Sequence, residues 1–308
     1  MVMQVSECTV IKQTERLCLT ILSLCLLLQP LQAEIPQWWK DTHQYDGVSD
    51  WSEYMTYTSG FFGPNALPVF EISDGHVAAC HQAEISTDFF WGFGDQTQSL
   101  SARFTYTFIP GRLAVTGWGV LAEHYQTTTA VRDLRASLVE DPEETVLIGD
   151  VYLSTQIGLL KEKRYVPDLM MEIILKTASS KSAAGARFFD TPGYCLNLAG
   201  GKSVLFSESF IHEIRFAGTI GFLCYQMNSR YQNDAPVYGA KVQFFSGPWM
   251  WENGFGGYDG WTGEGDNPQV LRSKLLYQMA SMQYFVQYQH ALKDYPFRRM
   301  QAGVVFDF

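Results

Sequence analysis

From about residue 79 to residue 308, apolar and polar residues alternate along the chain. Alternation with a period of two predicts β-strands whose two faces meet different environments, because successive side chains point to opposite faces. One apolar row consists of Leu100, Ala102, Phe104, Tyr106 and Phe108, and the polar row between them of Ser99, Ser101, Arg103, Thr105 and Thr107. Comparable rows run through 147–159, 168–176, 213–222, 238–244 and 281–289. Many rows exceed the roughly 5–6 residues of an average soluble strand.

Short polar breaks separate these rows, as at Asp95-Gln96-Thr97 and Pro110-Gly111-Arg112, and they favour hairpins. Longer breaks fall at 128–145 and 253–268. The rows cover the roughly 9–11 residues that a tilted strand needs to cross a bilayer. In hydrocarbon the backbone has no water to bond with, so a sheet there must close on itself. The pattern predicts an all-β fold, a transmembrane antiparallel up-and-down β-barrel of about twelve strands, within a range of about 10–14.

Composition changes this picture little. Charged residues make up 18% of the chain and aromatic residues 15%. A soluble sandwich, the competing fold, would need shorter strands and more charge on its outer face. The net charge of −10 disfavours nucleic acid as a partner, because phosphate binding needs an excess of Lys and Arg.

The N-terminal part of the chain reads as a targeting segment. Leu17 to Leu28 is almost entirely apolar and follows Lys12 and Arg16. The apolar stretch is short for a membrane helix, and small or aliphatic residues precede Ala33. We therefore expect a signal peptide over residues 1–33, cleaved after Ala33.

Residues 34–75 lack clean alternation. This segment contains Trp38, Trp39 and Trp51, and two prolines, Pro64 and Pro68, which argue against a regular strand. We expect an irregular aromatic segment that plugs the lumen, caps the barrel or docks a partner. Residues 76–308 are expected to form the barrel.

The last ten residues carry a second targeting pattern. Met300, Ala302, Val304, Phe306 and Phe308 share one face of the final row. This pattern resembles the C-terminal β-signal of Gram-negative outer-membrane β-barrel proteins. The resemblance implies location in the outer membrane, contact with its lipid, and recognition of Phe306 and Phe308 by the barrel-assembly machinery during insertion.

Charged residues of both signs recur on the face that should line the lumen. They are Glu84, Asp88, Arg103, Asp150, Glu172, Lys176, Glu213, Arg215, Lys241, Arg272, Lys274 and Arg299. A twelve-strand barrel is narrow, so these charges either pair across it or line a thin polar pathway. We favour a narrow channel for a small polar solute. The alternative is a non-conducting barrel subunit of a larger outer-membrane assembly or uptake complex, with other outer-membrane proteins or lipoproteins as partners.

Aromatic residues suggest contacts outside the lumen. Trp249, Trp251, Tyr258 and Trp261 are candidates for docking a partner or stacking on a glycan. An interfacial girdle is expected from Phe89, Trp91, Phe93, Tyr225, Trp249, Trp251 and Tyr288.

Candidate chemistry is weak. His76, Cys80 and Glu84 would share a strand face but span roughly 13 Å, too far for one ion, so no metal is expected. A membrane-embedded hydrolase is disfavoured because Ser209 and His212 fall on opposite faces of a regular strand. We therefore expect no catalytic residues and no cofactor. Cys80 and Cys195 either form a disulfide or remain, with Cys224, separate thiols.

Overall fold

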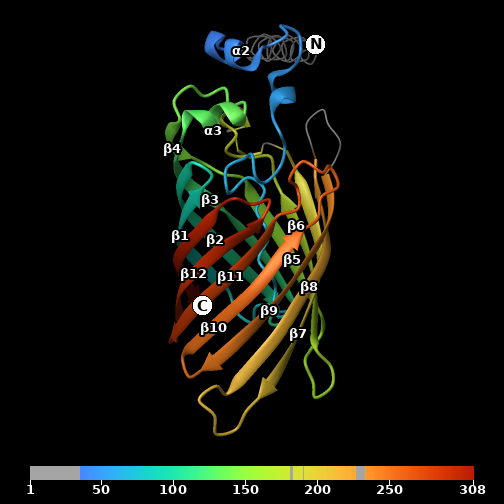
Figure 1. The fold of residues 1–308 in the computed structure, drawn as a ribbon. Helices are drawn as coiled ribbons and strands as arrows, with labels where there is room; N and C mark the ends of the chain where they lie inside the picture. The colour runs from blue at the N-terminus through green and yellow to red at the C-terminus, as the bar shows by residue number, and fades with distance from the viewer. Residues whose placement is uncertain (1–34, 181–182, 190, 227–232) are drawn as a thin grey trace, which may run out of the picture.

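The computed structural model describes residues 35–180, 183–189, 191–226 and 233–308. Within these residues, twelve antiparallel strands form one closed barrel (Figure 1). Its strands are β1 (Gln82–Gly92), β2 (Asp95–Ile109), β3 (Leu113–Thr127), β5 (Val151–Leu160), β6 (Asp168–Lys176), β7 (Gly193–Leu205), β8 (Glu213–Tyr225), β9 (Asn233–Ser246), β10 (Trp249–Tyr258), β11 (Gln269–Met279), β12 (Met282–Lys293) and β13 (Arg298–Asp307). The predicted fold class and strand number are therefore confirmed. The predicted signal peptide lies outside the described residues.

Neighbouring strands of the barrel follow one another along the chain. The ring closes where β1 pairs with β13, from Gln82 opposite Asp307 to Trp91 opposite Arg298. A further short strand, β4 (Glu143–Leu147), pairs only with the end of β3. The described residues form two helices, α2 (Gln37–His43) and α3 (Thr129–Leu134), and the 3-10 turns η1 (Trp51–Tyr54) and η2 (Ala183–Gly185). No helix in the described part of the chain is long and apolar enough to cross a membrane.

The two rims of the barrel differ. One rim, called the long-loop end, carries α3, β4 and the connection 259–268. The other, called the short-turn end, carries the turns 110–112, 247–248 and 280–281 (Figure 1). The break expected at 253–268 is shorter than that, because residues 253–258 complete β10 and only 259–268 form a loop.

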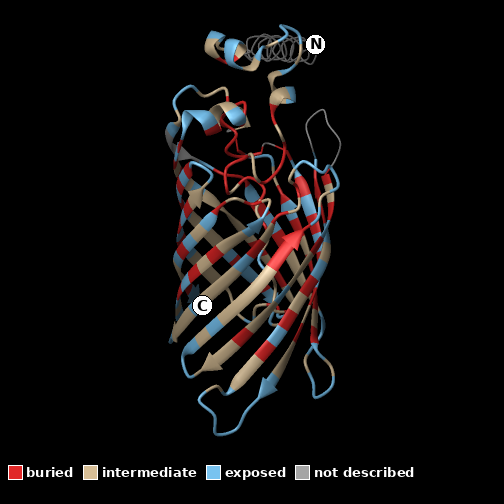
Figure 2. Cartoon of the chain, viewed as in Figure 1, coloured by how far each residue is buried: buried red, intermediate tan, exposed pale blue. Residues whose placement is uncertain are grey.

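Burial along each strand is the reverse of that in a soluble protein. On β1, Ser86 and Asp88 are buried, whereas Ile85 and Phe89 are exposed, the latter by 53%. Exposed and buried residues alternate up the whole barrel wall (Figure 2). The exposed row is the apolar one, so the outer wall presents hydrocarbon-like surface and contacts membrane lipid.

The chain runs through the inside of the barrel before β1 begins. Residues 55–80, called the plug segment, descend from the long-loop end to the short-turn end (Figure 1). At the upper end the amide of Gly63 donates to the carbonyl of Ala186, 2.8 Å away. At the lower end the amide of Gly111, in a short turn, donates to the carbonyl of Ala78. The plug segment thus occupies the lumen along its length.

Candidate functional site: the occupied lumen

An aromatic seal closes the lumen near the long-loop end. Phe62 of the plug segment packs against Tyr57 and Phe189, with ring centroids 5.6 and 5.4 Å apart. Tyr295 donates its hydroxyl to the carbonyl of Pro64 at 2.7 Å. All of these side chains are buried, and the seal appears as the buried mass inside the upper barrel (Figure 2). The short helix α2 sits above, where fully buried Trp39 donates to the carbonyl of Ala136.

A buried ion network surrounds this seal. Arg187, fully buried, contacts Asp95 at 2.6 Å and Glu123 at 2.9 Å. Arg135 also contacts Asp95 at 2.6 Å, and Asn65 of the plug segment donates to Glu123 at 2.7 Å. The network ties the plug segment to the wall. None of these four charged residues was singled out from the sequence, because Arg135 and Arg187 come from loops and no alternation marks loop residues.

Below the seal lies a cavity of about 180 Å³, called the inner chamber. Its lining combines the plug residues 68–71 with charged and aromatic side chains of the wall. Eight predicted lumen residues lie in its lining, namely Glu84, Asp88, Arg103, Asp150, Glu172, Arg272, Lys274 and Arg299. Arg299 contacts Asp88 at 2.6 Å, whereas Arg103 is 4.0 Å from Glu84 and stacks on the ring of Trp118.

A second cavity of about 630 Å³, the outer chamber, reaches the short-turn end. Its lining includes the turn residues Gly111, Arg112 and Lys161. Both chambers are lined by Glu71, Arg103 and Glu172, so they meet at the level of these three residues. Together they make a polar space that is open toward the short turns and closed by the aromatic seal above.

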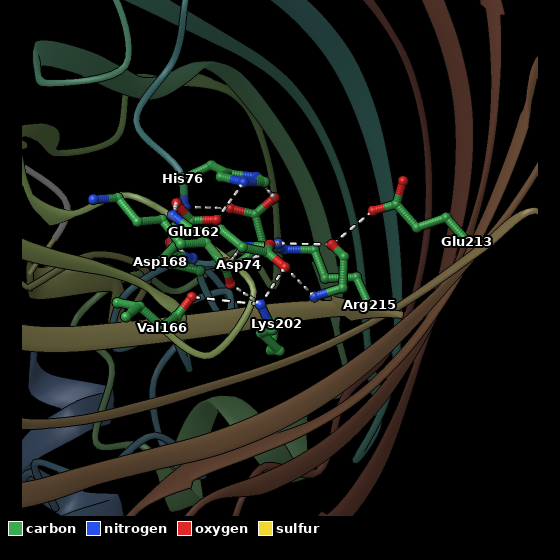
Figure 3. A network of polar contacts seen from close by, with 12 residues as sticks. Asp74, His76, Glu162, Val166, Asp168, Lys202, Glu213 and Arg215 are labelled. Carbon is green, nitrogen blue, oxygen red and sulfur yellow. Dashed lines mark hydrogen bonds and ion pairs between the residues drawn. The ribbon is translucent and has the colours of Figure 1, made fainter. Parts of the chain in front are cut away.

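A cluster of charges holds the lower plug segment to the wall (Figure 3). His76 Nε2 lies 2.8 Å from Asp168, and Arg215 donates twice to the backbone carbonyl of Asp74. Arg215 also contacts Asp168 at 3.0 Å and Glu162 at 2.8 Å. We call this cluster the latch. Sequence analysis named Arg215 as a lumen residue but missed Asp74, Glu162 and Asp168.

Electrostatics within the latch favour its charged form. Asp74 is the main cause that raises the pKa of His76; burial opposes this shift, and Asp168 adds to it. Burial also disfavours the ionised form of Glu162, but hydrogen bonds from Lys202, the Ser203 amide and Arg215 lower its pKa to about 2. The latch contacts therefore favour the protonated imidazole of His76 and the ionised carboxylate of Glu162.

Ligand atoms of His76, Glu162 and Asp168 lie within 4.8 Å of one another, a spacing that could hold a metal ion. Arg215, however, donates to both carboxylates, and Lys202 contacts Glu162 at 3.0 Å. These two side chains already supply positive charge at the carboxylates, so we interpret the group as part of the latch. The cluster weighed from the sequence is not assembled, since Glu84 lies beside Arg103 instead.

The remaining predicted lumen residues pair along the wall. Lys176 contacts Asp150 at 2.6 Å, and Lys241 contacts Glu252 at 2.9 Å. Glu172 accepts from Gln156, and Glu213 accepts from Ser203 at 2.7 Å. Lys176 and Lys241 thus pair with carboxylates of the wall, and the space between the walls is taken by the plug segment and the two chambers.

The four aromatic residues predicted to dock a partner or glycan do not form one surface. Trp249 and Trp251 lie on the outer wall near the short-turn end, where Trp251 stacks on Phe244. Trp261 lies in the connection at the opposite rim and is 62% exposed. Tyr258 cannot dock a partner, because it is 2% exposed and belongs to the interior seal.

Tyr225 was also wrongly placed in the outer girdle. Its side chain is buried and packs edge-on against Tyr258, with centroids 6.5 Å apart. Both residues end their strands beside the plug segment, where the lumen is aromatic instead of polar.

Other sequence expectations have plain outcomes. Cys80, Cys195 and Cys224 are free, so the possible Cys80–Cys195 disulfide is not formed. Ser209 and His212 lie in the loop between β7 and β8, outside any strand. Phe306 faces outward on β13, and Phe308 follows that strand, where it exchanges two backbone hydrogen bonds with His81.

Comparisons with known proteins agree on the class. The COG4313 outer-membrane channel from Pseudomonas putida F1 superimposes with a TM-score of 0.54 at 12% identity, over 78% of this chain and 100% of that one. The NanC porin gives a TM-score of 0.47 at 7% identity, over 73% and 100% of the two chains. The KdgM porin gives 0.44 at 10% identity, over 73% and 99%. No family model and no curated protein matches the sequence.

The fold is therefore that of a Gram-negative outer-membrane β-barrel. At these identities the likeness establishes the architecture, and the activity must be argued from the lumen.

Proposed function

We propose that this protein is a narrow outer-membrane channel for a small polar solute and that its plug segment closes the channel in the conformation described. The observation that carries the proposal is the pair of adjoining chambers below the aromatic seal. A barrel that served only as a rigid body would gain from filling this space, because close packing stabilises an interior. Instead, charged groups line two adjoining cavities below the seal.

Opening requires movement of the plug segment and not of the barrel. The wall strands are joined by continuous hydrogen-bond ladders. The plug segment is held by side-chain contacts to the seal, the upper ion network and the latch, with isolated backbone hydrogen bonds near its two ends. Segments held in this way open at lower free energy than a closed sheet.

Single-channel conductance in a planar bilayer tests the proposal. Full-length protein should give infrequent discrete steps, and a variant lacking residues 35–75 should give frequent ones. The control is a disulfide that fixes the plug segment to β10. A Cβ at Gly256 would lie 3.4 Å from Cγ1 of Ile72, so the double variant Ile72→Cys, Gly256→Cys brings two thiols close enough to form a disulfide. The oxidised pair should be silent and the reduced pair active.

The rival function is a non-conducting barrel subunit of a larger assembly. The closed aromatic seal and the exposed Trp261 beside it favour this alternative. If full-length, truncated and reduced proteins are all silent, yet migrate on a gel as folded, heat-modifiable barrels, the channel is excluded and the subunit role stands.

For biogenesis, we propose that the barrel-assembly machinery recognises β13 through Phe306 and Phe308. The support is the alternating apolar row and the place of β13 at the closing seam of the ring. Replacing both aromatics with Ala should reduce the folded protein in the outer membrane, and equal membrane yield would contradict this assignment.

A further inference from the structure

The inner chamber contains an arrangement of charge that suggests what the channel carries, and the inference rests on the proposed function. Four cationic side chains of the wall line this chamber, and we call them the basic cluster. The basic cluster consists of Arg103, Arg272, Lys274 and Arg299. All four interact electrostatically with one carboxylate, that of Glu71 in the plug segment.

Two members of the basic cluster lack a carboxylate partner on the wall. Among the residues that the structure describes, neither Arg272 nor Lys274 has an ion pair within 4.0 Å. Arg272 and Lys274 are two apart on β11, so they point to the same face and into the chamber. Both side chains are partly buried. Removing a cation from water without a close counter-ion is costly, so two such cations side by side favour a nearby anion.

The plug segment supplies the missing oxygen atoms. Arg272 donates to the backbone carbonyls of Val69 and Phe70, the latter at 2.9 Å. Glu71, the next residue, brings its carboxylate into the same chamber and accepts from Gln287. Three consecutive plug residues thus present acceptor oxygens to the basic cluster, as a bound carboxylate ligand would.

The surroundings of the basic cluster fit a small organic anion better than a bare ion. Trp118, Tyr152, Phe285 and Tyr295 line the chamber and offer apolar contact. The forked guanidinium groups match the two oxygens of a carboxylate. Lys274 lies over the ring of Phe285 at 4.2 Å, which places its ammonium group beside an apolar surface.

We propose that the basic cluster is a binding site for small carboxylate solutes and that Glu71 occupies it as a tethered competing ligand. A solute arriving through the outer chamber would displace Glu71 and the two carbonyls, because both chambers meet at Glu71. Solute binding would then favour release of the plug segment, since a ligand stabilises the state to which it binds better.

Equilibrium binding of succinate to the detergent-folded, full-length protein tests this proposal, with calorimetry as the readout. Glu71→Gln removes the competing charge and should tighten succinate binding by about tenfold, or about 1.4 kcal/mol. The matched control is Glu264→Gln, which removes a carboxylate from the exposed connection 259–268 and should bind like wild type. Adding Lys274→Gln to Glu71→Gln should abolish the gain.

The uncharged diamide of succinate distinguishes charge recognition from simple pore filling. The proposal is overturned if Glu71→Gln binds succinate no better than wild type, or if the diamide binds as well as the dianion. Because binding is measured without conduction, the two proposals fail separately. Tighter binding by a silent barrel would keep the site and reject the channel, whereas conducting steps without succinate binding would keep the channel and reject the site.

Discussion

At the scale of single residues, glycines on the barrel wall allow the plug segment to lie against it. The side chain of Ile72 inserts between Gly239 and Gly256, where added Cβ atoms would approach it to 1.9 and 2.8 Å. The backbone carbonyl oxygen of Asp74 lies against Gly201, where an added Cβ would approach it to 2.2 Å. Glycine within a strand often marks such a close approach. Gly256 on β10 has this structural reason.

Gly256→Ala should therefore loosen the plug segment. The new methyl group overlaps Ile72 but no backbone atom closer than 3.7 Å, so the strand itself is spared. Overpacking of this kind costs about 1 kcal/mol, which should make openings about fivefold more frequent in bilayer recordings.

The control for this experiment is Gly218→Ala, whose methyl group would meet only the carbonyl of Gly239 at 3.4 Å. In an Ile72→Ala background, the effect of Gly256→Ala should shrink, because the two side chains are coupled. Equal opening rates for all of these variants would mean that this contact does not seat the plug segment.

At the scale of elements, the latch joins the plug segment to β6 and β8 and to the connection between β5 and β6. The charged groups facing His76 are Asp74 and Asp168, which favour its protonation, and Arg215, which opposes it. Glu162 and Lys202 complete the cluster. Protonated His76 thus contributes to holding the lower plug segment.

Closure should accordingly weaken as pH rises. The pKa of His76 is raised in the folded protein, so its stabilisation is complete below the ordinary value of about 6.5 and is lost as pH passes through the raised pKa. Openings should become more frequent as pH rises above about 6.5. His76→Gln should remove this dependence, and His212→Gln, in an exposed loop at the same rim, should retain it. Persistence of the full pH response in His76→Gln would contradict the latch.

At the scale of the whole molecule, the upper ion network joins a loop, two strands and the plug segment. Arg187 provides the common contact, because it bonds Asp95, Thr97 and Glu123. Removing one partner of a buried ion pair leaves the other charge uncompensated.

Arg187→Ala should destabilise the barrel by about 3–5 kcal/mol. Urea unfolding, followed by loss of the heat-modifiable band, measures this change. Arg164→Ala, at an exposed position in the β5–β6 connection, should lie within about 0.5 kcal/mol of wild type. A similar midpoint for both variants would show that the upper network adds little stability.

The sequence predicts the barrel well because strand alternation is a local pattern. The alternating residues around Phe104 and Phe108 show that one face of the strand meets lipid and the other the lumen. This prediction needs no knowledge of contacts with distant parts of the sequence. It predicts the lumen contents poorly. Glu71 carries no local sign of its four cationic neighbours, and Arg187 meets Asp95 across 92 positions of sequence. The predictions for Tyr225 and Tyr258 are wrong for the same reason, because the lumen beside them is apolar only through the presence of the plug segment.

The threaded plug segment also constrains how the molecule is built. Residues 35–54 lie at the long-loop end, while β1 begins at the short-turn end, so the covalent chain passes through a ring whose seam is β1 with β13. A ring sealed beforehand would have to admit α2, with its two tryptophans, past the wall side chains that contact the plug segment. In the simpler order of assembly, β13 pairs with β1 only after the plug segment is in place. The plug segment would then serve as the template around which the strands close into a ring.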